Sequence, residues 1–317
     1  MPKIAYREIR MNAERRKMAE LAGSILEEYS AAGYMLTLRG LYYKFVARDL
    51  FPASWADPET GSTNNNKSYD KLGELVSDAR LCGIIDWELM EDKTREIDGN
   101  AHWSSPADII EDSALAFRLD KWWNQPNRVE VWVEKDAQEA VVAKAARRLD
   151  LQFFSCRGYC SATSFWQAGQ RLAEYVEAGQ RPVILHLGDF DPSGLDMTRD
   201  IEERVRLFMG DAGGDLTVER IALTMPQIKQ YKPPPNPAKV TDARYANYKA
   251  EHGAKCWELD ALEPAVVDQL IEVAALAFRD DELFEEAAEE EAVGRKRLKT
   301  TSANWSKLQK TLEKMEQ

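Results

Sequence analysis

The fold of this chain is decided by the stretch RPVILHLGDFDPSG, residues 181–194. Its first half is an almost continuous apolar run, which is typical of a strand in the middle of a parallel sheet. Its second half carries two acids in D-x-D spacing and then Pro-Ser-Gly, where a helix is expected to begin. The stretch RVEVWVEK, residues 128–135, repeats this order of a buried strand followed by an acid. Because sites in such sheets lie at the carboxyl ends of strands, both stretches predict where chemistry would occur.

Strands and helices alternate regularly around these two stretches. The expected strands are 128–134, 151–155, 181–189 and 216–223, and the expected helices between them are 135–149, 161–179 and 193–209. A β-α-β-α-β-α-β alternation predicts an α/β domain whose parallel sheet is covered by helices on both faces.

The N-terminal third follows a different pattern. Hydrophobic spacing predicts three helices, followed by one or two short strands; the helices are 9–31, 36–50 and 68–83, and the strands fall within 84–97. Three helices before a β-wing is the order of a winged-helix domain, in which the third helix enters the major groove of DNA. A plain helical bundle is the alternative.

The remaining segments complete the expected domains. We expect a helix over 106–124, no regular structure in 232–239, a strand or turn over 254–262, and helices over 263–278 and from 280 onward. The chain then divides into four parts: a winged-helix domain (1–104), a linking helix (105–126), an α/β domain (127–279) and a charged C-terminal helix (280–317).

The charge of the chain limits how it can bind nucleic acid. The net charge is −12 and the sequence pI is about 5.0, so the surface as a whole is the wrong sign for gripping DNA. Residues 280–291 hold eight acidic side chains and no basic one, however, and this leaves the rest of the chain close to neutral. The acidic run is either a solvated helix face or an arm that pairs with basic groups. Local DNA contacts are expected from the basic residues Lys44, Arg48, Lys67, Lys71 and Arg80.

Composition also bears on the compartment and on the available chemistry. Four cysteines give no disulfide framework, and three histidines give little material for histidine-based metal sites or triads. No apolar window approaches the ~20 residues of a membrane span. We therefore expect a soluble, cytoplasmic protein without a membrane partner.

Three acids follow the predicted strands. Glu134 ends the first strand, and Asp189 and Asp191 end the third. An all-oxygen set without histidine or cysteine favours Mg²⁺ or Mn²⁺, which can bridge phosphate oxygens. The alternative is that Asp189 and Asp191 cap the helix that follows. Lys135 is a possible phosphate contact or an ordinary surface residue.

Two adjacent tyrosines, Tyr42 and Tyr43, lie on the second predicted helix. Arg39 precedes them by three and four residues, so it shares a helix face with them. A nucleophilic tyrosine needs a nearby cation and an acceptor phosphate, and bidentate arginine suits phosphate. The alternative is that one ring is packed in the core and the other is half exposed.

Together these segments resemble one family. VWVEK and GDFDPSG on this strand pattern resemble a Toprim domain. The upstream RGLYY resembles the catalytic tyrosine segment of the topoisomerase VI A subunit and the related meiotic double-strand-break protein. HGAKCWELDAL and CRGYCSATSFW also resemble segments of that family, in the same order. The length is most similar to that of the compact, stand-alone relatives carried by bacteria, plasmids and phages.

The resemblance implies several roles. Tyr43 would be the nucleophile, Arg39 would steady the phosphate, and Glu134, Asp189 and Asp191 would hold the metal. The reaction would leave a 5′-phosphotyrosyl link to DNA, within a homodimer whose tyrosine and Toprim domain act in trans. Gly40 departs from the family, which often has an acidic residue there. No nucleotide-binding motif is present, so strand passage would need a separate ATPase partner.

Two other functions fit parts of the pattern. A Toprim nuclease would use the same metal site but would hydrolyse DNA with water. A non-catalytic module would bind DNA through the winged helix, while a degenerate Toprim domain and the acidic tail recruit partners.

Overall fold

The computed structural model describes residues 3–90, 100–238 and 240–315. Contacts between Cα atoms divide the chain into two compact units. The first contains residues 1–93 and 129–275, and the second contains residues 94–128 and 276–317. Each unit therefore joins segments that are far apart in the sequence. None of the described helices is long and apolar enough to cross a membrane.

The centre of the first unit is a four-stranded sheet of order β2-β1-β3-β4, which confirms the predicted α/β class. Its strands are β1 (Asn127–Val133), β2 (Gln152–Ser155), β3 (Arg181–Leu187) and β4 (Thr217–Ala222). β1 pairs with β2 in parallel, and so does β3 with β4. β1 and β3 are almost wholly buried, as their apolar runs predict.

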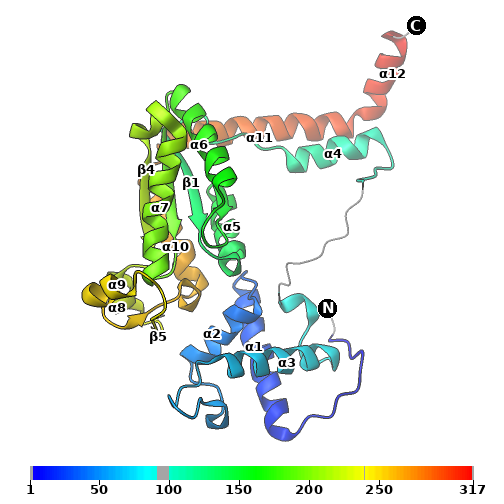
Figure 1. Cartoon of the computed structure of the whole chain (residues 1–317). Coiled ribbons are helices and arrows are strands. Elements are labelled where there is room, and N and C mark those ends of the chain that lie inside the picture. The colour runs from blue at the N-terminus through cyan, green and yellow to red at the C-terminus, as the bar shows by residue number, and fades with distance from the viewer. Residues whose placement is uncertain (1–2, 91–99, 239, 316–317) are drawn as a thin grey trace. The chain divides into compact units, whose positions relative to one another are not determined.

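Three helices connect these strands in the predicted order. They are α5 (Glu139–Arg148), α6 (Ala162–Glu177) and α7 (Pro192–Met209). α6 and α7 lie side by side against the sheet (Figure 1), and their apolar faces enclose Trp132, Phe165 and Ile201. Capping side chains determine where two of these helices begin. Ser161 accepts a hydrogen bond from Ser164 N at the start of α6, and Asp191 accepts one from Gly194 N at the start of α7.

The N-terminal part of the first unit is a three-helix cluster. Its helices are α1 (Ala13–Ala31), α2 (Leu38–Ala47) and α3 (Asn66–Leu81). Thr37 caps α2 as predicted, with its side chain accepting from Gly40 N. The apolar faces of all three helices share one core, which also includes Ala261 from the far end of the chain. This core joins the tyrosine helix α2 to the segment that follows the sheet.

The predicted wing differs from the structure in its described part. Residues 84–90 form no paired strand; they contain a 3₁₀ turn over Trp87–Leu89 and a single bridge between Met90 and Leu36. Asp86 explains this turn, because its side chain accepts from Glu88 N and bends the backbone. The rest of the predicted wing, residues 91–97, lies outside the described residues.

Short elements follow the sheet. They are α8 (Met225–Tyr231), β5 (Asn236–Pro237), α9 (Tyr245–His252), β6 (Lys255–Cys256) and α10 (Pro264–Leu276). The prediction that 232–239 has no regular structure is wrong for two residues, because Asn236 and Pro237 form a short strand that pairs antiparallel with β6. Helix α9 was not predicted, and its weak amphipathic pattern gives the reason.

The second unit consists of α4 (Pro106–Ala116), α11 (Asp281–Ala303) and α12 (Trp305–Met315), with α4 running alongside α11 (Figure 1). α4 ends eight residues before the predicted boundary at 124. The backbone turns away there because Arg295 on α11 donates to Phe117 O, and Glu291 accepts from Leu119 N. The predicted single tail helix is likewise two helices, separated at Asn304, whose side chain donates to Thr300 O.

Candidate active site at the strand ends

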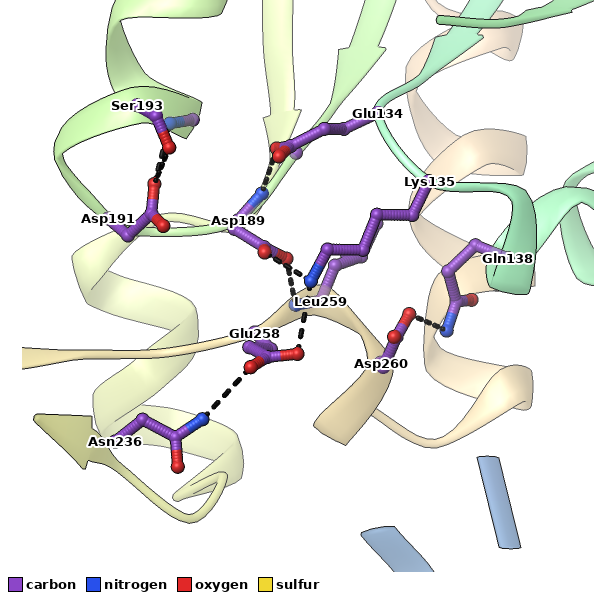
Figure 2. A network of polar contacts seen from close by, with 12 residues as sticks. Glu134, Lys135, Gln138, Asp189, Asp191, Ser193, Asn236, Glu258, Leu259 and Asp260 are labelled. Carbon is purple, nitrogen blue, oxygen red and sulfur yellow. Dashed lines mark hydrogen bonds and ion pairs between the residues drawn. The ribbon is translucent and has the colours of Figure 1, made fainter. Parts of the chain in front are cut away.

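Glu134 and Asp189 are direct neighbours at the carboxyl ends of β1 and β3. Asp189 N donates to Glu134 Oε2 at 2.8 Å, and both side chains are buried (Figure 2). No side chain would fit between them: a Cβ added to Gly188 would lie 2.8 Å from Glu134 Oε2. The adjacency of β1 and β3 therefore brings two of the three predicted acids together.

A lysine closes this pair of acids on one side. Lys135 Nζ forms an ion pair with Asp189, and it lies 3.0 Å from Glu258 Oε2. The other oxygen of Asp189 accepts from Leu259 N at 2.8 Å. Lys135 thus neutralises a buried acid in this structure, and it is not an ordinary solvated side chain.

Burial dominates the electrostatics of the two acids. It raises the pKa of Asp189, and the nearby charge of Glu134 adds to this, although Lys135 opposes both. Burial also raises the pKa of Glu134, against a hydrogen bond from Asp189 N. A bound cation would lower both pKa values further, in the same direction as Lys135.

The third acid, Asp191, lies at the same strand end but has a structural task. Its Oδ1 accepts from Gly194 N at 2.6 Å and from Ser193 Oγ at 3.0 Å, so it caps α7. The capping alternative therefore accounts for Asp191, and it does not account for Glu134 or Asp189.

The residues at the strand ends meet only some of the requirements of a metal site. The donors are oxygens of the kind that Mg²⁺ and Mn²⁺ take, but Lys135 already pairs with Asp189. In the described residues, however, no three His, Cys, Asp or Glu side chains form a group that could hold a metal. Glu134 and Asp189 would be the first two ligands. Asp191 could become a third ligand only if Oδ1 bound the metal while still capping α7, or if its other carboxylate oxygen turned toward the metal.

The two tyrosines of α2 are both buried. Their rings meet edge to face with centroids 5.4 Å apart. The hydroxyl of Tyr42 donates to Asn64 Oδ1 at 2.9 Å, which fixes it within the helical domain. Tyr43 instead lies beside Arg39, which pairs with Glu258 in the far segment of the unit. The alternative of one packed and one half-exposed ring is therefore wrong, because neither ring is half exposed.

Burial raises the pKa of the Tyr43 phenol, and the negative charge of Glu258 raises it further, while Arg39 acts in the opposite direction. Arg39 lies with its guanidinium carbon 5.8 Å from the centre of the Tyr43 ring. In this arrangement Tyr43 is a protonated phenol held beside a cation.

Glu258 is the centre of the polar network in Figure 2. It pairs with Arg39 and with Lys135, and Oε1 accepts from Asn236 Nδ2 at 3.1 Å. Burial alone would raise the pKa of Glu258, but these cations bring it down to about 2, so the side chain is ionised. Through Glu258, the tyrosine helix and the strand-end acids share one continuous set of contacts.

Asp260 makes a second connection of the same kind. It accepts from Arg39 Nε at 2.8 Å and from Gln138 Nε2 at 3.0 Å. Neither Glu258 nor Asp260 was assigned a role from the sequence. The only signal was the ELDAL segment within the family resemblance, which gives no direction for its side chains.

Arg220 on β4 is a further residue that the sequence did not indicate. Its side chain is largely enclosed, and it donates to the carbonyl oxygens of Gly188, Asp189, Gly194 and Leu223. Burial lowers the pKa of Arg220 to about 10, which still leaves it charged at neutral pH. The guanidinium of Arg220 thus fixes the backbone of the loop that carries Asp189 and Asp191.

The five basic residues predicted to contact DNA have different surroundings. Lys44 is a correction: it is buried, with Nζ 3.0 Å from Glu263 Oε1 and 3.2 Å from Leu262 O. An ammonium group held in this way offers nothing to a phosphate at the surface. Arg48 is paired through both nitrogens with Glu28.

The other three basic residues predicted to contact DNA lie on α3. Lys67 is exposed, Lys71 lies 5.1 Å from the centre of the Trp55 ring, and Arg80 stacks on Trp87. Lys67 and Lys71 therefore remain the basic groups that this helix presents outward.

The comparisons with known proteins add no relative: the chain matches no protein-family model, no curated protein and no solved structure.

Proposed function

We propose that this protein cleaves DNA strands by tyrosine transesterification with Mg²⁺ or Mn²⁺, as the topoisomerase VI A family does. On this proposal α1 to α3 serve as a winged-helix domain and the sheet serves as a Toprim domain. The observation that carries it is that Arg39, which lies beside Tyr43, pairs with Glu258, and that Glu258 also pairs with Lys135, the partner of Asp189. A tyrosine, two cations and two buried acids in one network are the parts that the reaction requires.

The proposed step is a single exchange of bonds at phosphorus. The Tyr43 hydroxyl oxygen forms a bond to the phosphorus, and the bond from phosphorus to the 3′ oxygen of the neighbouring nucleotide breaks. The phenol proton leaves Tyr43, and the departing 3′ oxygen gains a proton. One end of the strand is then a free 3′ hydroxyl, and the other is a 5′-phosphotyrosyl ester.

The residues of the chain divide this task. Arg39 can bind a phosphate through two nitrogens, and Lys135 can approach it as a point charge. Glu134 and Asp189, joined by Asp191, would hold the metal, which would supply charge stabilisation at the departing oxygen. Before this, a DNA phosphate must take Arg39 from Glu258, because both compete for the same guanidinium.

The remaining expectations belong to the same proposal. The substrate is DNA, and the working form is a homodimer in which Tyr43 serves the metal site of the second copy. Such an exchange would require Tyr43 to leave its buried position beside Arg39 of its own chain. Strand passage would need a separate ATPase partner, and the composition favours a cytoplasmic location.

A covalent-trapping assay tests the proposal. Labelled DNA is incubated with the full chain and Mg²⁺ or Mn²⁺, the reaction is stopped with denaturant, and protein-bound DNA is measured. We expect an adduct with wild type and with Tyr42→Phe, and none with Tyr43→Phe. Tyr42 is the matched control, because its buried ring is adjacent but bonds only within the helical domain.

A hydrolytic nuclease is the second candidate, and the burial of Tyr43 favours it. Because burial and the charge of Glu258 raise the pKa of the Tyr43 phenol, Tyr43 is a poor nucleophile in this arrangement, and water could replace it at the same metal site. Cleavage that persists in Tyr43→Phe and is lost in Asp189→Asn would establish this alternative.

A further inference from the structure

Helix α11 in the second unit has one face that is fixed and one that is open. The fixed face contains Ala287, Glu291 and Gly294. Glu291 is buried and pairs with Lys121 and Arg295, both within the same unit. A Cβ added to Gly294 would lie 2.5 Å from the Phe117 ring, so the helix is in close contact on this side. The rotation of α11 about its axis is therefore set by these contacts.

The opposite face is exposed along the middle of the helix. At 100° per residue its members cover about a third of the circumference. They are Glu286, Glu289, Glu290, Val293, Lys296, Arg297 and Thr300, all exposed. Within the part of the chain that the structure describes, no ion pair involves the four charged side chains nearest to Val293. Val293 is a β-branched apolar residue that is 49% exposed among them.

The order of charges on this face is complementary to itself. Glu290 and Lys296 lie three residues on either side of Val293, and Glu289 and Arg297 lie four residues on either side. A two-fold axis through Val293 therefore places each acid opposite a base of a second copy, twice over. A parallel pairing would instead place like charges opposite each other.

We propose that this face of α11 is a docking surface for a second copy of the chain, in an antiparallel helix pair centred on Val293. Because Glu289 and Lys296 lie on one side of Val293 and Glu290 and Arg297 lie on the other, the pair would contain two Glu289–Lys296 contacts, two Glu290–Arg297 contacts and a central Val293–Val293 contact. The proposal uses residues of the second unit alone, and it does not depend on any DNA chemistry.

Ion pairs at a surface are individually weak, so the four pairs and the central Val293 contact predict a modest affinity.

The competing explanation is a solvated helix whose acids lie near its N-terminus and whose bases lie near its C-terminus, as the helix dipole favours. That explanation accounts for the order of charges along the axis, and it predicts no association through this face, so that reversing its charges leaves the oligomeric state unchanged. The two explanations therefore differ in whether self-association depends on these four charged side chains.

Sedimentation velocity of the full chain over roughly 1 to 100 µM distinguishes them. We expect a dimer whose affinity falls at least about tenfold between roughly 50 and 500 mM NaCl, because salt screens surface charges. Glu289→Lys with Glu290→Lys should give a monomer, and so should Lys296→Glu with Arg297→Glu. All four reversals together should restore the dimer.

The matched control is Glu174→Lys with Glu177→Lys on α6, which makes the same change of charge at exposed positions and should leave the dimer intact. A wild type that is monomeric throughout the range overturns the proposal. A dimer that survives the double reversal at 289 and 290, or a fourfold reversal that stays monomeric, also overturns it.

Discussion

Arg39 and Glu258 form an ion pair although 219 residues separate them in the chain. Arg39 comes from the tyrosine helix α2, and Glu258 follows β6, beyond the sheet. Asp260 takes a second nitrogen of the same guanidinium, and Lys135 takes the same oxygen of Glu258. One charged cluster thus links the helix that carries Tyr43 to the acids at the strand ends. The cluster therefore stabilises the fold and also positions the groups of the proposed reaction.

Glu258→Gln tests the structural task. The amide keeps the size of the side chain but removes the negative charge shared by Arg39 and Lys135. We expect a loss of about 1 to 3 kcal/mol in the free energy of unfolding, since charged hydrogen bonds are replaced by weaker ones. Urea denaturation measures it, with the exposed Glu174→Gln as control. In a double-mutant cycle with Arg39→Gln, additive losses would show that the pair is not coupled.

Arg220→Met tests how the acid-bearing loop is held. Four carbonyl oxygens lose a donor in the interior, although that of Gly188 keeps a second donor, Leu223 N at 2.8 Å. Since each unsatisfied buried group costs about 1 to 3 kcal/mol, the variant should lose on the order of 3 to 5 kcal/mol. Arg220→Lys should recover part of this loss, because it retains the charge but not the planar fork. An unfolding free energy within about 1 kcal/mol of wild type for Arg220→Met would contradict the account.

Because His186 is buried, we expect the free energy of unfolding to depend on pH in a specific way. It is fully buried in β3, with Nδ1 2.8 Å from Thr198 Oγ1. Burial, aided by the charge of Arg220, lowers the pKa of His186 to about 3. The unfolded chain binds this proton near pH 6.5, so the stabilisation is complete above that pH and is lost as the pH falls toward 3.

His186→Gln removes this titration. Between about pH 6 and 4 its unfolding free energy should fall less steeply than that of wild type, by up to about 1.4 kcal/mol per pH unit. Chemical denaturation at several pH values gives the two slopes. Equal slopes would mean that His186 is protonated in the folded protein or titrates normally.

Much of the first unit could be predicted from the sequence, because its strands are continuous apolar runs between amphipathic helices. The pairing of α4 with α11 could not, since it joins segments almost 200 residues apart and depends on single contacts such as that of Glu291 with Leu119 N. Arg220 was missed because an arginine in LTVERIAL looks like the exposed side of a strand. Lys44 was misplaced because its partner, Glu263, lies in a distant segment.

The acids at the strand ends predict a response to divalent ions. A ligand that binds only the folded state stabilises it by mass action, by about 2.7 kcal/mol at a concentration a hundred times its Kd. Mg²⁺ or Mn²⁺ should therefore raise the melting temperature of wild type. Asp189→Asn and Glu134→Gln should abolish this increase, and the exposed Asp211→Asn should retain it. An increase that persists in Asp189→Asn would place the ion elsewhere.

The most direct test of the central claim is to find which residue carries the DNA. The trapped protein is digested with nuclease and protease, and the peptide bearing a nucleotide is sequenced by mass spectrometry. The account predicts a 5′-phosphoryl nucleotide on the hydroxyl oxygen of Tyr43 and no modified peptide from the Tyr43→Phe variant. DNA that is cut without any modified peptide, or a nucleotide attached to a residue other than Tyr43, would contradict it.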